Sequence, residues 1–248
     1  MSLPRFFVVS DTIADGRVML RGEELLRMRK VLRLRPGAQI LLFDTEGMEH
    51  EAFIHAYGES TAEITVVRSY DPQRESPLAI TLAQAVGKGD KMDWVVEKTT
   101  ELGVARIVPF LSSYTVPKLD RGRGDKRRER WSKIAISAAK QSGRTRIPAI
   151  LDVQDFETLL TRDWQCEGKL FFWERPSGKG LVAVQEESSV LRSVLVVVGS
   201  EGGFSAEEES KASGHGFQTV RLGKRILRTE TAAMAAVCAV QLLWGDMG

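Results

Sequence analysis

Two stretches near the end of the chain combine glycines with charged residues, and each lies between an apolar run and a helical pattern. The first reads VLVVVGSEGGFSAEE, residues 194–208, and the second reads LGKRILRTETAA, residues 222–233. Glycine lets the backbone take positive φ angles and approach a ligand closely. Because ligands of open parallel sheets bind beyond the carboxyl ends of the strands, two strand-turn-helix units in succession predict a ligand site.

A nucleotide phosphate is the first ligand to consider, because helix N-termini bind phosphates. Neither turn contains G-x-G-x-x-G or G-x-x-x-x-G-K-[ST], and the stretch GKGDK at 87–91 fits neither pattern. Ser205 and Glu208 have the spacing of a capping box, and Glu207 and Glu209 add negative charge to the same helix start. These carboxylates would repel a phosphate, which speaks against a nucleotide-dependent α/β enzyme of another class.

A ligand without phosphates fits the two turns better. Glycines would permit close backbone approach, and apolar residues could wall a slot for a flat ring. The residues concerned are Gly199, Gly202, Gly203 and Gly223, with Leu222, Ile226 and Leu227. Two tight turns without any ligand would use the same glycines, so the turns alone leave both interpretations open.

The pattern of apolar residues predicts two domains. Residues 1–72 read as short strands with one helical segment at 22–31, the pattern of a small β-barrel. The stretch DPQRESP, 71–77, contains two prolines and is the candidate linker. From residue 73 onward strands and helices alternate, and the last helix is expected over 229–244 with Thr229 as its N-cap. This alternation predicts an α/β domain with a parallel sheet covered by helices on both faces.

Composition indicates an ordinary soluble protein. Of the 248 residues 43% are apolar and 27% charged, and the net charge is +2. The longest apolar runs are too short to cross a bilayer, so we expect a cytoplasmic protein without a membrane partner. Cys166 and Cys238 stand far apart, and the three histidines lack ligand spacing, so no metal is expected.

Positive charge is concentrated in the middle of the chain. Between residues 118 and 146 there are eleven lysines and arginines against three acidic residues, a local charge of +8 that leaves −6 for the remainder. Phosphate neutralisation supplies most of the sequence-independent affinity for nucleic acids, so the cluster favours a polyanionic partner. A solvated helix face beside a loop is the alternative.

Together with four other stretches, the two glycine turns resemble the paired signature of the ribosomal RNA uridine N3-methyltransferases that act on the small subunit, within the SPOUT superfamily. The other stretches are KVLRLRPG, LLFD, QAVGKGDKMDWVVEKTTELGV and RWSKIAISAAKQSGR. The resemblance covers nearly the whole chain. Three features depart from it. Ser200 and Lys224 stand where the family usually has proline, and the stretch SSYTVPKLD, 112–120, lacks an arginine that is typical of the family before KLD.

The resemblance implies a fold and an activity. Residues 1–72 would form a PUA-like, RNA-binding β-barrel, and residues 73–248 a SPOUT methyltransferase domain whose deep trefoil knot binds S-adenosylmethionine. The protein would act as a homodimer on N3 of a specific uridine in 16S ribosomal RNA, within the assembled small subunit. The alternatives are a SPOUT methyltransferase acting on another RNA and a non-catalytic ribosome-assembly factor that binds RNA.

The resemblance also suggests roles for individual residues. Arg228 would stabilise negative charge that develops on a carbonyl oxygen of the base, unless it pairs at the helix end with Glu230 or with an acidic residue of a partner chain. Glu201 is the weaker candidate for proton acceptor, since it could instead cap backbone amides or hold the cofactor amine. The expected cofactor-binding residues are Glu174, Gly199, Glu201, Gly202, Leu222, Gly223, Ile226, Leu227 and Arg228.

Binding the RNA would require a second set of residues. N3 lies on the Watson–Crick edge, so the target uridine must be unpaired or flipped out. The candidate phosphate contacts, each of which could also lie on a solvated face, are Arg33, Lys88, Lys91, Lys98, Arg127, Arg128 and Arg144. Trp94 or Trp131 could stack a base, although an aromatic residue at helical spacing is typical of a core.

Overall fold

The chain folds as two compact units. The computed structural model describes residues 3–114, 121–175, 178–187 and 190–248, and of residues 121–123 the backbone alone. The first unit comprises Met1–Glu75 and Ala139–Ile147, and the second comprises Ser76–Ala138 and Pro148–Gly248. The first boundary lies three residues after the expected one, at 72. Nothing in the sequence pattern indicated that Ala139–Ile147 belongs with the first unit.

A five-stranded sheet forms the first unit, in the order β1-β3-β4-β5-β2. Its strands are β1 (Arg5–Phe7), β2 (Arg17–Leu20), β3 (Gln39–Phe43), β4 (Glu49–Tyr57) and β5 (Ala62–Tyr70), and its short helices are η1 (Ser10–Thr12), α1 (Gly22–Leu26) and η2 (Arg27–Val31). Strand β1 runs parallel to β3, and the other pairs are antiparallel. Alternate apolar residues of β4, such as Ala52 and Ile54, lie in the core of the unit because strand side chains point to opposite faces.

The expected β-barrel is only partly present in this unit. Within the described residues, the end strands β1 and β2 pair with β3 and β5 but not with each other, so the sheet is open. The sequence pattern located four of the strands and the helical segment at 22–31, and missed β2, which is only four residues long. A PUA-like identity for the unit therefore stays a prediction.

An eight-stranded, wholly parallel sheet forms the second unit. Its order is β11-β13-β10-β12-β6-β7-β8, and β9 also pairs with β7. The strands are β6 (Ala79–Ala85), β7 (Arg106–Leu111), β8 (Ala149–Ile150), β9 (Gln154–Asp155), β10 (Gly168–Phe172), β11 (Lys179–Gly180), β12 (Ser193–Val198) and β13 (Gln218–Arg221). Central strand β12 is almost continuously apolar, as expected of a parallel strand buried on both faces.

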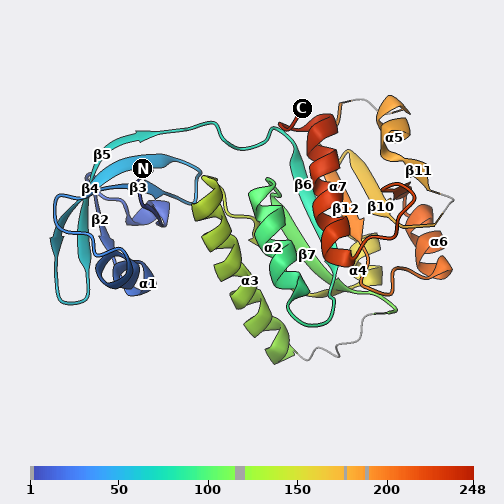
Figure 1. Ribbon diagram of the computed structural model, residues 1–248, viewed down its shortest axis with the longest axis horizontal. Helices are drawn as coiled ribbons and strands as arrows, with labels where there is room; N and C mark the ends of the chain where they lie inside the picture. Colours follow the sequence, from blue (N-terminus) through green and yellow to red (C-terminus); the bar gives the residue numbers. More distant parts are fainter. Residues whose placement is uncertain (1–2, 115–120, 176–177, 188–189) are drawn as a thin grey trace. The chain divides into compact units, whose positions relative to one another are not determined.

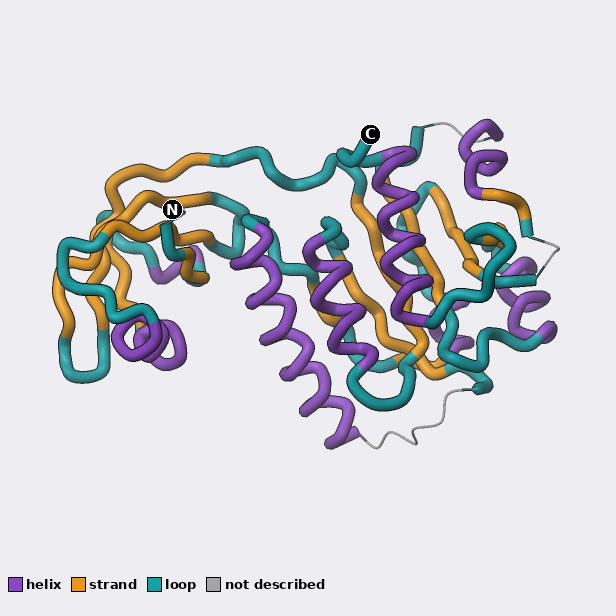
Figure 2. The backbone as a smooth tube through the Cα atoms, viewed as in Figure 1, coloured by secondary structure: helices purple, strands orange, loops and turns teal. Residues whose placement is uncertain are grey.

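Helices cover both faces of this sheet, as the alternating pattern predicted (Figure 1). The helices of the chain after residue 75 are α2 (Lys91–Glu101), α3 (Arg121–Ser142), α4 (Phe156–Thr161), α5 (Leu181–Glu187), α6 (Ala206–Gly214) and α7 (Thr229–Trp244). Helices α2 and α7 lie side by side over one face (Figure 2). The opposite face carries an aromatic core that includes Phe110, Phe171 and Phe204, with Leu159 of α4 and Ala212 of α6. No helix in the described ranges is both long and apolar enough to cross a membrane.

The register of the parallel sheet brings four strand ends to one edge. Val198 of β12 pairs with Gln84 of β6 on one side and with Phe172 of β10 on the other, and Phe172 in turn pairs with Val220 of β13. The chain therefore leaves β6, β10, β12 and β13 at the same level. Segments that follow these strands converge there, although they are far apart in the sequence.

A buried ion pair fastens the segment after α3 to the rest of the first unit. The guanidinium of Arg144 donates to Glu75 at 2.6 and 3.1 Å, and Glu75 also accepts from the backbone N–H groups of Thr145 and Arg146. Arg144 is 6% exposed. A guanidinium that is buried and paired in this way is poorly placed for a phosphate, which favours a structural role; the RNA contact of Arg144 stays a prediction.

Replacing Arg144 with alanine should destabilise the first unit strongly. The change leaves the Glu75 carboxylate without its cationic partner, and breaking a buried pair costs about 3 kcal/mol. Urea unfolding would measure the loss. Arg35→Ala, which removes an exposed arginine of the same unit, should change the unfolding free energy by less than about 0.5 kcal/mol. An Arg144→Ala protein as stable as the wild type would contradict the structural role.

Candidate functional site

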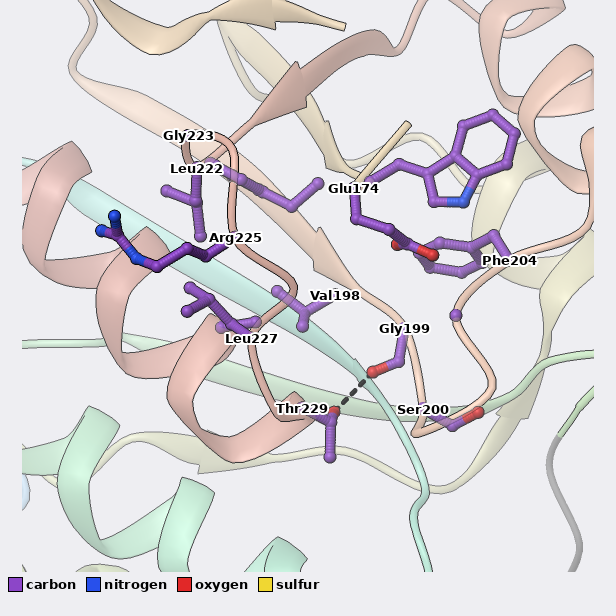
Figure 3. Close-up of a pocket in the computed structure, with 14 residues that line it drawn as sticks. Glu174, Val198, Gly199, Ser200, Phe204, Leu222, Gly223, Arg225, Leu227 and Thr229 are labelled. Atoms are coloured by element: carbon purple, nitrogen blue, oxygen red, sulfur yellow. Dashed lines mark hydrogen bonds between the residues drawn. The ribbon is translucent and has the colours of Figure 1, made fainter. Parts of the chain in front are cut away.

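A pocket opens at the edge where the four strand ends meet (Figure 3). It encloses about 510 Å³ that protein atoms do not fill, part of it open to solvent. Its lining residues end β10 and β12, follow β10, β12 and β13, or begin α7, and they are Phe172, Trp173, Glu174, Val198, Gly199, Ser200, Gly203, Phe204, Leu222, Gly223, Arg225, Leu227, Thr229 and Ala232. A largely apolar lining with a few polar groups is typical of small-molecule sites.

The turn after β12 is too tight for side chains at two of its glycines. A Cβ atom on Gly199 would lie 3.0 Å from the Phe204 ring and 3.2 Å from the backbone of Gly203. Gly203 has φ +67°, and its Cβ would lie 2.9 Å from the Glu174 carboxylate. The turn closes through the N–H of Gly203, which donates to the carbonyl of Ser200 at 3.0 Å. Glycine is required here by the close packing of the turn itself.

Five of the nine expected cofactor-binding residues line the pocket, namely Glu174, Gly199, Leu222, Gly223 and Leu227. The other four, Glu201, Gly202, Ile226 and Arg228, lie on the same turns outside the lining. Gly202 packs against another segment, because its Cβ would lie 2.7 Å from the Cβ of Tyr114. Ile226 is 84% exposed. For all nine residues a contact with a cofactor remains a prediction.

The sequence pattern missed several lining residues, and two of them carry unpaired polar atoms. The indole Nε1 of Trp173 and the hydroxyl of Ser200 are buried and have no hydrogen-bond partner within the described residues. Buried polar groups are nearly always paired, so these two residues are candidates for hydrogen bonds to a ligand of the pocket. Arg225 is the one cationic residue of the lining. A ligand with polar edges fits this set.

Beside the pocket, Lys91 lies between two carboxylates. Its Nζ is 2.9 Å from Glu201 and 4.0 Å from Glu230, and the backbone N–H of Lys88 also donates to Glu201. Burial alone would raise the pKa of the Glu201 carboxyl, but the hydrogen bond from Lys91 and two backbone N–H groups lower it on balance. Lys91 thus links the start of α2 to the turn after β12. Because the Glu201 carboxylate neutralises much of its positive charge, Lys91 would bind a phosphate only weakly.

Arg228 occupies the N-cap position of α7, where Thr229 was expected. The expectation was off by one residue, because Thr229 is already helical and its hydroxyl turns inward to the carbonyl of Gly199. Arg228 is exposed. Within the described residues its guanidinium has no hydrogen bond or ion pair, and Glu230, the partner considered for it, faces Lys91 instead. The exposed cation therefore stands free beside the pocket.

The remaining RNA candidates lie in different settings. Arg33 is exposed in the first unit with φ +50°, whereas Lys98 on α2 is paired with Glu97 and Glu101. Arg128 on α3 pairs with Asp152. No ion pair is seen for Arg127 or Lys88 among the described side chains; Lys88 is exposed and Arg127 is half-buried.

The two tryptophans considered for base stacking differ sharply in exposure. Trp131 is 3% exposed and belongs to the core, whereas Trp94 is 58% exposed. The ammonium of Lys98 lies 5.9 Å from the Trp94 ring. In the described part of the chain, no group of His, Cys, Asp and Glu side chains could hold a metal ion.

The fold and pocket define a parallel α/β protein with a ligand site at the strand ends, and comparisons with known proteins specify its class. Residues 74–241 match the family model described as the RNA methyltransferase domain. The chain is 34% identical to the ribosomal RNA small subunit methyltransferase E of Bacillus subtilis over 235 residues, 92% of each protein.

Two solved structures are similar over nearly their whole length. A ribosomal RNA small subunit methyltransferase E from Neisseria gonorrhoeae, bound to S-adenosyl methionine, is 37% identical with a TM-score of 0.89 and 100% coverage of both chains. A Legionella pneumophila protein, in complex with the same cofactor, is 32% identical with a TM-score of 0.90, covering 99% of this chain and 100% of the other. The chain therefore belongs to the RNA methyltransferase family, among the relatives named ribosomal RNA small subunit methyltransferase E.

Glu201→Gln should lower stability at neutral pH, and the loss should become smaller in acid. The pKa of Glu201 is lowered in the folded protein, so its carboxylate stabilises the fold above the ordinary value of 4.5 and loses this effect as the pH falls through the folded value. Because the Lys91 pair is partly exposed, about 0.5–1 kcal/mol is expected at pH 7. Urea unfolding at pH 7 and pH 3 measures the difference. A Glu186→Gln control, at an exposed position, should match the wild type at both pH values; an equal loss for Glu201→Gln at pH 3 would contradict the ion pair.

Proposed function

We propose that this protein is an S-adenosylmethionine-dependent methyltransferase that modifies N3 of a specific uridine in 16S ribosomal RNA. One observation carries the proposal: the two family-typical turns form one pocket with unpaired polar atoms, and a free arginine stands at its edge. The relatives named for small-subunit RNA methylation, and the cofactor bound in two similar structures, support it.

The residues of the pocket fit S-adenosylmethionine. Apolar Leu222, Leu227 and Phe172 would flank the adenine, Trp173 and Ser200 offer unpaired hydrogen-bonding groups, and Glu174 offers a carboxylate for a cationic group. When bound, the cofactor supplies a methyl group made electrophilic by its sulfonium. A cofactor without phosphates also suits the capping box, in which Ser205 and Glu208 already satisfy the start of α6.

Arg228 is the residue that we assign to the reacting base. Uracil N3 must lose its proton to attack a methyl group, and the negative charge that then spreads to the carbonyl oxygens is stabilised by a nearby cation. A cation at a helix N-terminus opposes the helix dipole, so it does not serve the stability of α7. Glu201 is held by Lys91 and has a lowered pKa, so it is a weak base. We therefore propose that Glu201 positions its loop and that the proton leaves to solvent.

The other features implied by the family belong to the same proposal. The first unit would be a PUA-like RNA-binding domain, and the loops around the pocket would belong to a deep trefoil knot. The protein would act in the cytoplasm as a homodimer on the assembled small subunit. Exposed apolar side chains on the two adjacent helices, Trp94 on α2 and Leu242 on α7, are consistent with a protein partner there.

The activity test uses small ribosomal subunits that lack this modification. Purified protein and S-adenosylmethionine should yield 3-methyluridine, detected by mass spectrometry of nucleosides. At saturating S-adenosylmethionine, Arg228→Ala should reduce the rate about a hundredfold or more, because it removes a charge-stabilising group. Lys224→Ala, which removes an exposed cation from the same loop outside the pocket lining, should retain the rate.

Several outcomes would contradict this assignment. Binding of subunits without any methylated uridine would favour a non-catalytic assembly factor. Methylation of another RNA, with no reaction on small subunits, would overturn the substrate and keep the enzyme class. Equal losses for Arg228→Ala and Lys224→Ala would remove the special role of Arg228.

The salt dependence of RNA binding tests the contribution of α3. If Arg127 and Arg128 contact phosphates, replacing both with alanine should reduce the slope of log K against log salt by about 1.5–2, since each contact releases a counterion. Filter binding of 16S RNA at several salt concentrations measures the slope. The control is a second double variant, Arg162→Ala and Arg192→Ala, which also removes two positive charges from exposed positions. Equal slopes for both double variants would contradict a contact at α3.

A further inference from the structure

A buried glutamine lies directly behind the wall of the pocket. Gln84 is on β6, is 1% exposed, and is absent from the pocket lining. Its side-chain Nε2 donates to three acceptors: the carbonyl of Ala85 at 3.1 Å, the carbonyl of Gly199 at 3.2 Å and the hydroxyl of Thr229 at 2.9 Å. The carbonyl of Gly199 and the hydroxyl of Thr229 lie on segments remote from β6 in the sequence, whereas Ala85 is the chain neighbour of Gln84.

Thr229 closes the network. Its hydroxyl accepts from Gln84 and donates to the carbonyl of Gly199 at 2.5 Å (Figure 3). The Gly199 carbonyl therefore receives one hydrogen bond from β6 and one from the first turn of α7. Thr229 is 5% exposed, so water does not compete for these bonds.

This network joins the two turns that shape the pocket. Gly199 begins the turn after β12, and Thr229 ends the loop that carries Leu222 and Leu227. Both Gly199 and Thr229 line the pocket, and the network fixes the distance between them. The parallel register places Gln84 beside Val198, so β6 offers its side chain at the level where the chain leaves β12.

Glutamine at position 84 leaves one buried polar atom without a partner among the described residues, which is unfavourable and indicates that its amide has a specific role. The side-chain Oε1 of Gln84 is buried without a hydrogen-bond partner in the described part of the chain. Leaving a buried oxygen unpaired is unfavourable, and an apolar residue would avoid it. An apolar residue at position 84 would lack the amide N–H groups that donate to Gly199 and Thr229.

We propose that Gln84 is a positioning residue, which acts through Gly199 and Thr229 to hold the two turns at the spacing that the cofactor pocket requires. The inference rests on the proposed function, because it takes S-adenosylmethionine as the ligand of the pocket. Gln84 does not touch the ligand. Its loss widens the pocket and weakens the binding of substrate and product cofactor alike.

Calorimetric titration tests this claim with S-adenosylmethionine and with S-adenosylhomocysteine. Gln84→Leu and Thr229→Val should each raise both dissociation constants about tenfold, the effect of losing buried hydrogen bonds. Thr229→Ser keeps the hydroxyl and should stay within about twofold of the wild type. Since the two side chains act on one carbonyl, the double variant should lose less than the product of the two single effects.

Two further variants separate positioning from a general loss of stability. Gln241→Leu and Thr99→Val remove buried hydrogen bonds elsewhere in the second unit, to Leu102 and Val95. They should lower thermal stability as much as Gln84→Leu and leave cofactor affinity unchanged. Equal weakening by Gln241→Leu, or an unchanged affinity in Gln84→Leu, would overturn the proposal.

Hydrogen exchange of the ligand-free protein gives a readout that needs no cofactor. In Gln84→Leu, exchange should rise together in residues 199–204 and 222–229, whereas Gln241→Leu should leave both segments protected. If only one segment or neither responds, Gln84 does not couple them. A wild-type protein that binds no S-adenosylmethionine would overturn the proposed function, and the exchange comparison would still decide the coupling.

Discussion

The site depends on the parallel register of strand β12 between β6 and β10. Five of the six residues of β12 are fully buried apolar side chains, each worth about 1.5–3 kcal/mol when removed from water, so the strand cannot shift without a large loss. The position of Val198 then determines where the chain emerges as Gly199. Because β10 and β13 end at the same level, the segments after all three strands are brought to one pocket.

Charge has two separate uses in this chain. Some ionic groups form structural ion pairs. Glu75 pairs with Arg144 in the first unit, and Lys91 pairs with Glu201 in the second. Arg228 is exposed and unpaired among the described residues, although it stands at a helix end where a positive charge is unfavourable. The contrast supports the proposed role of Arg228 toward a substrate, and it shows why a count of positive charges is a poor guide to which residues are free for a partner.

Much of the second unit could be predicted from the sequence. Apolar periodicity, the capping box at Ser205 and the glycine after α2 located its main strands and helices, and α7 begins and ends at the expected residues. The short elements β8, β9, β11, α4 and α5 were missed because two to seven residues carry too little periodicity. The grouping of Ala139–Ile147 with the first unit depends on tertiary contacts that no local pattern records.

The sequence predicted the parts of the candidate site that depend on backbone conformation. It did not predict the parts that depend on how side chains pack in the folded protein. The glycines and leucines of the two turns stood out by type, whereas Trp173, Phe204 and Gln84 read as ordinary strand or core residues.

The measurement that tests the account most directly is a crystal structure of the protein with S-adenosylmethionine. The account predicts the cofactor between the turn at 199–204 and the loop at 222–228, with Trp173 Nε1 or Ser200 Oγ paired to it. A cofactor bound elsewhere, or a pocket that stays without it at saturating concentration, would contradict the account.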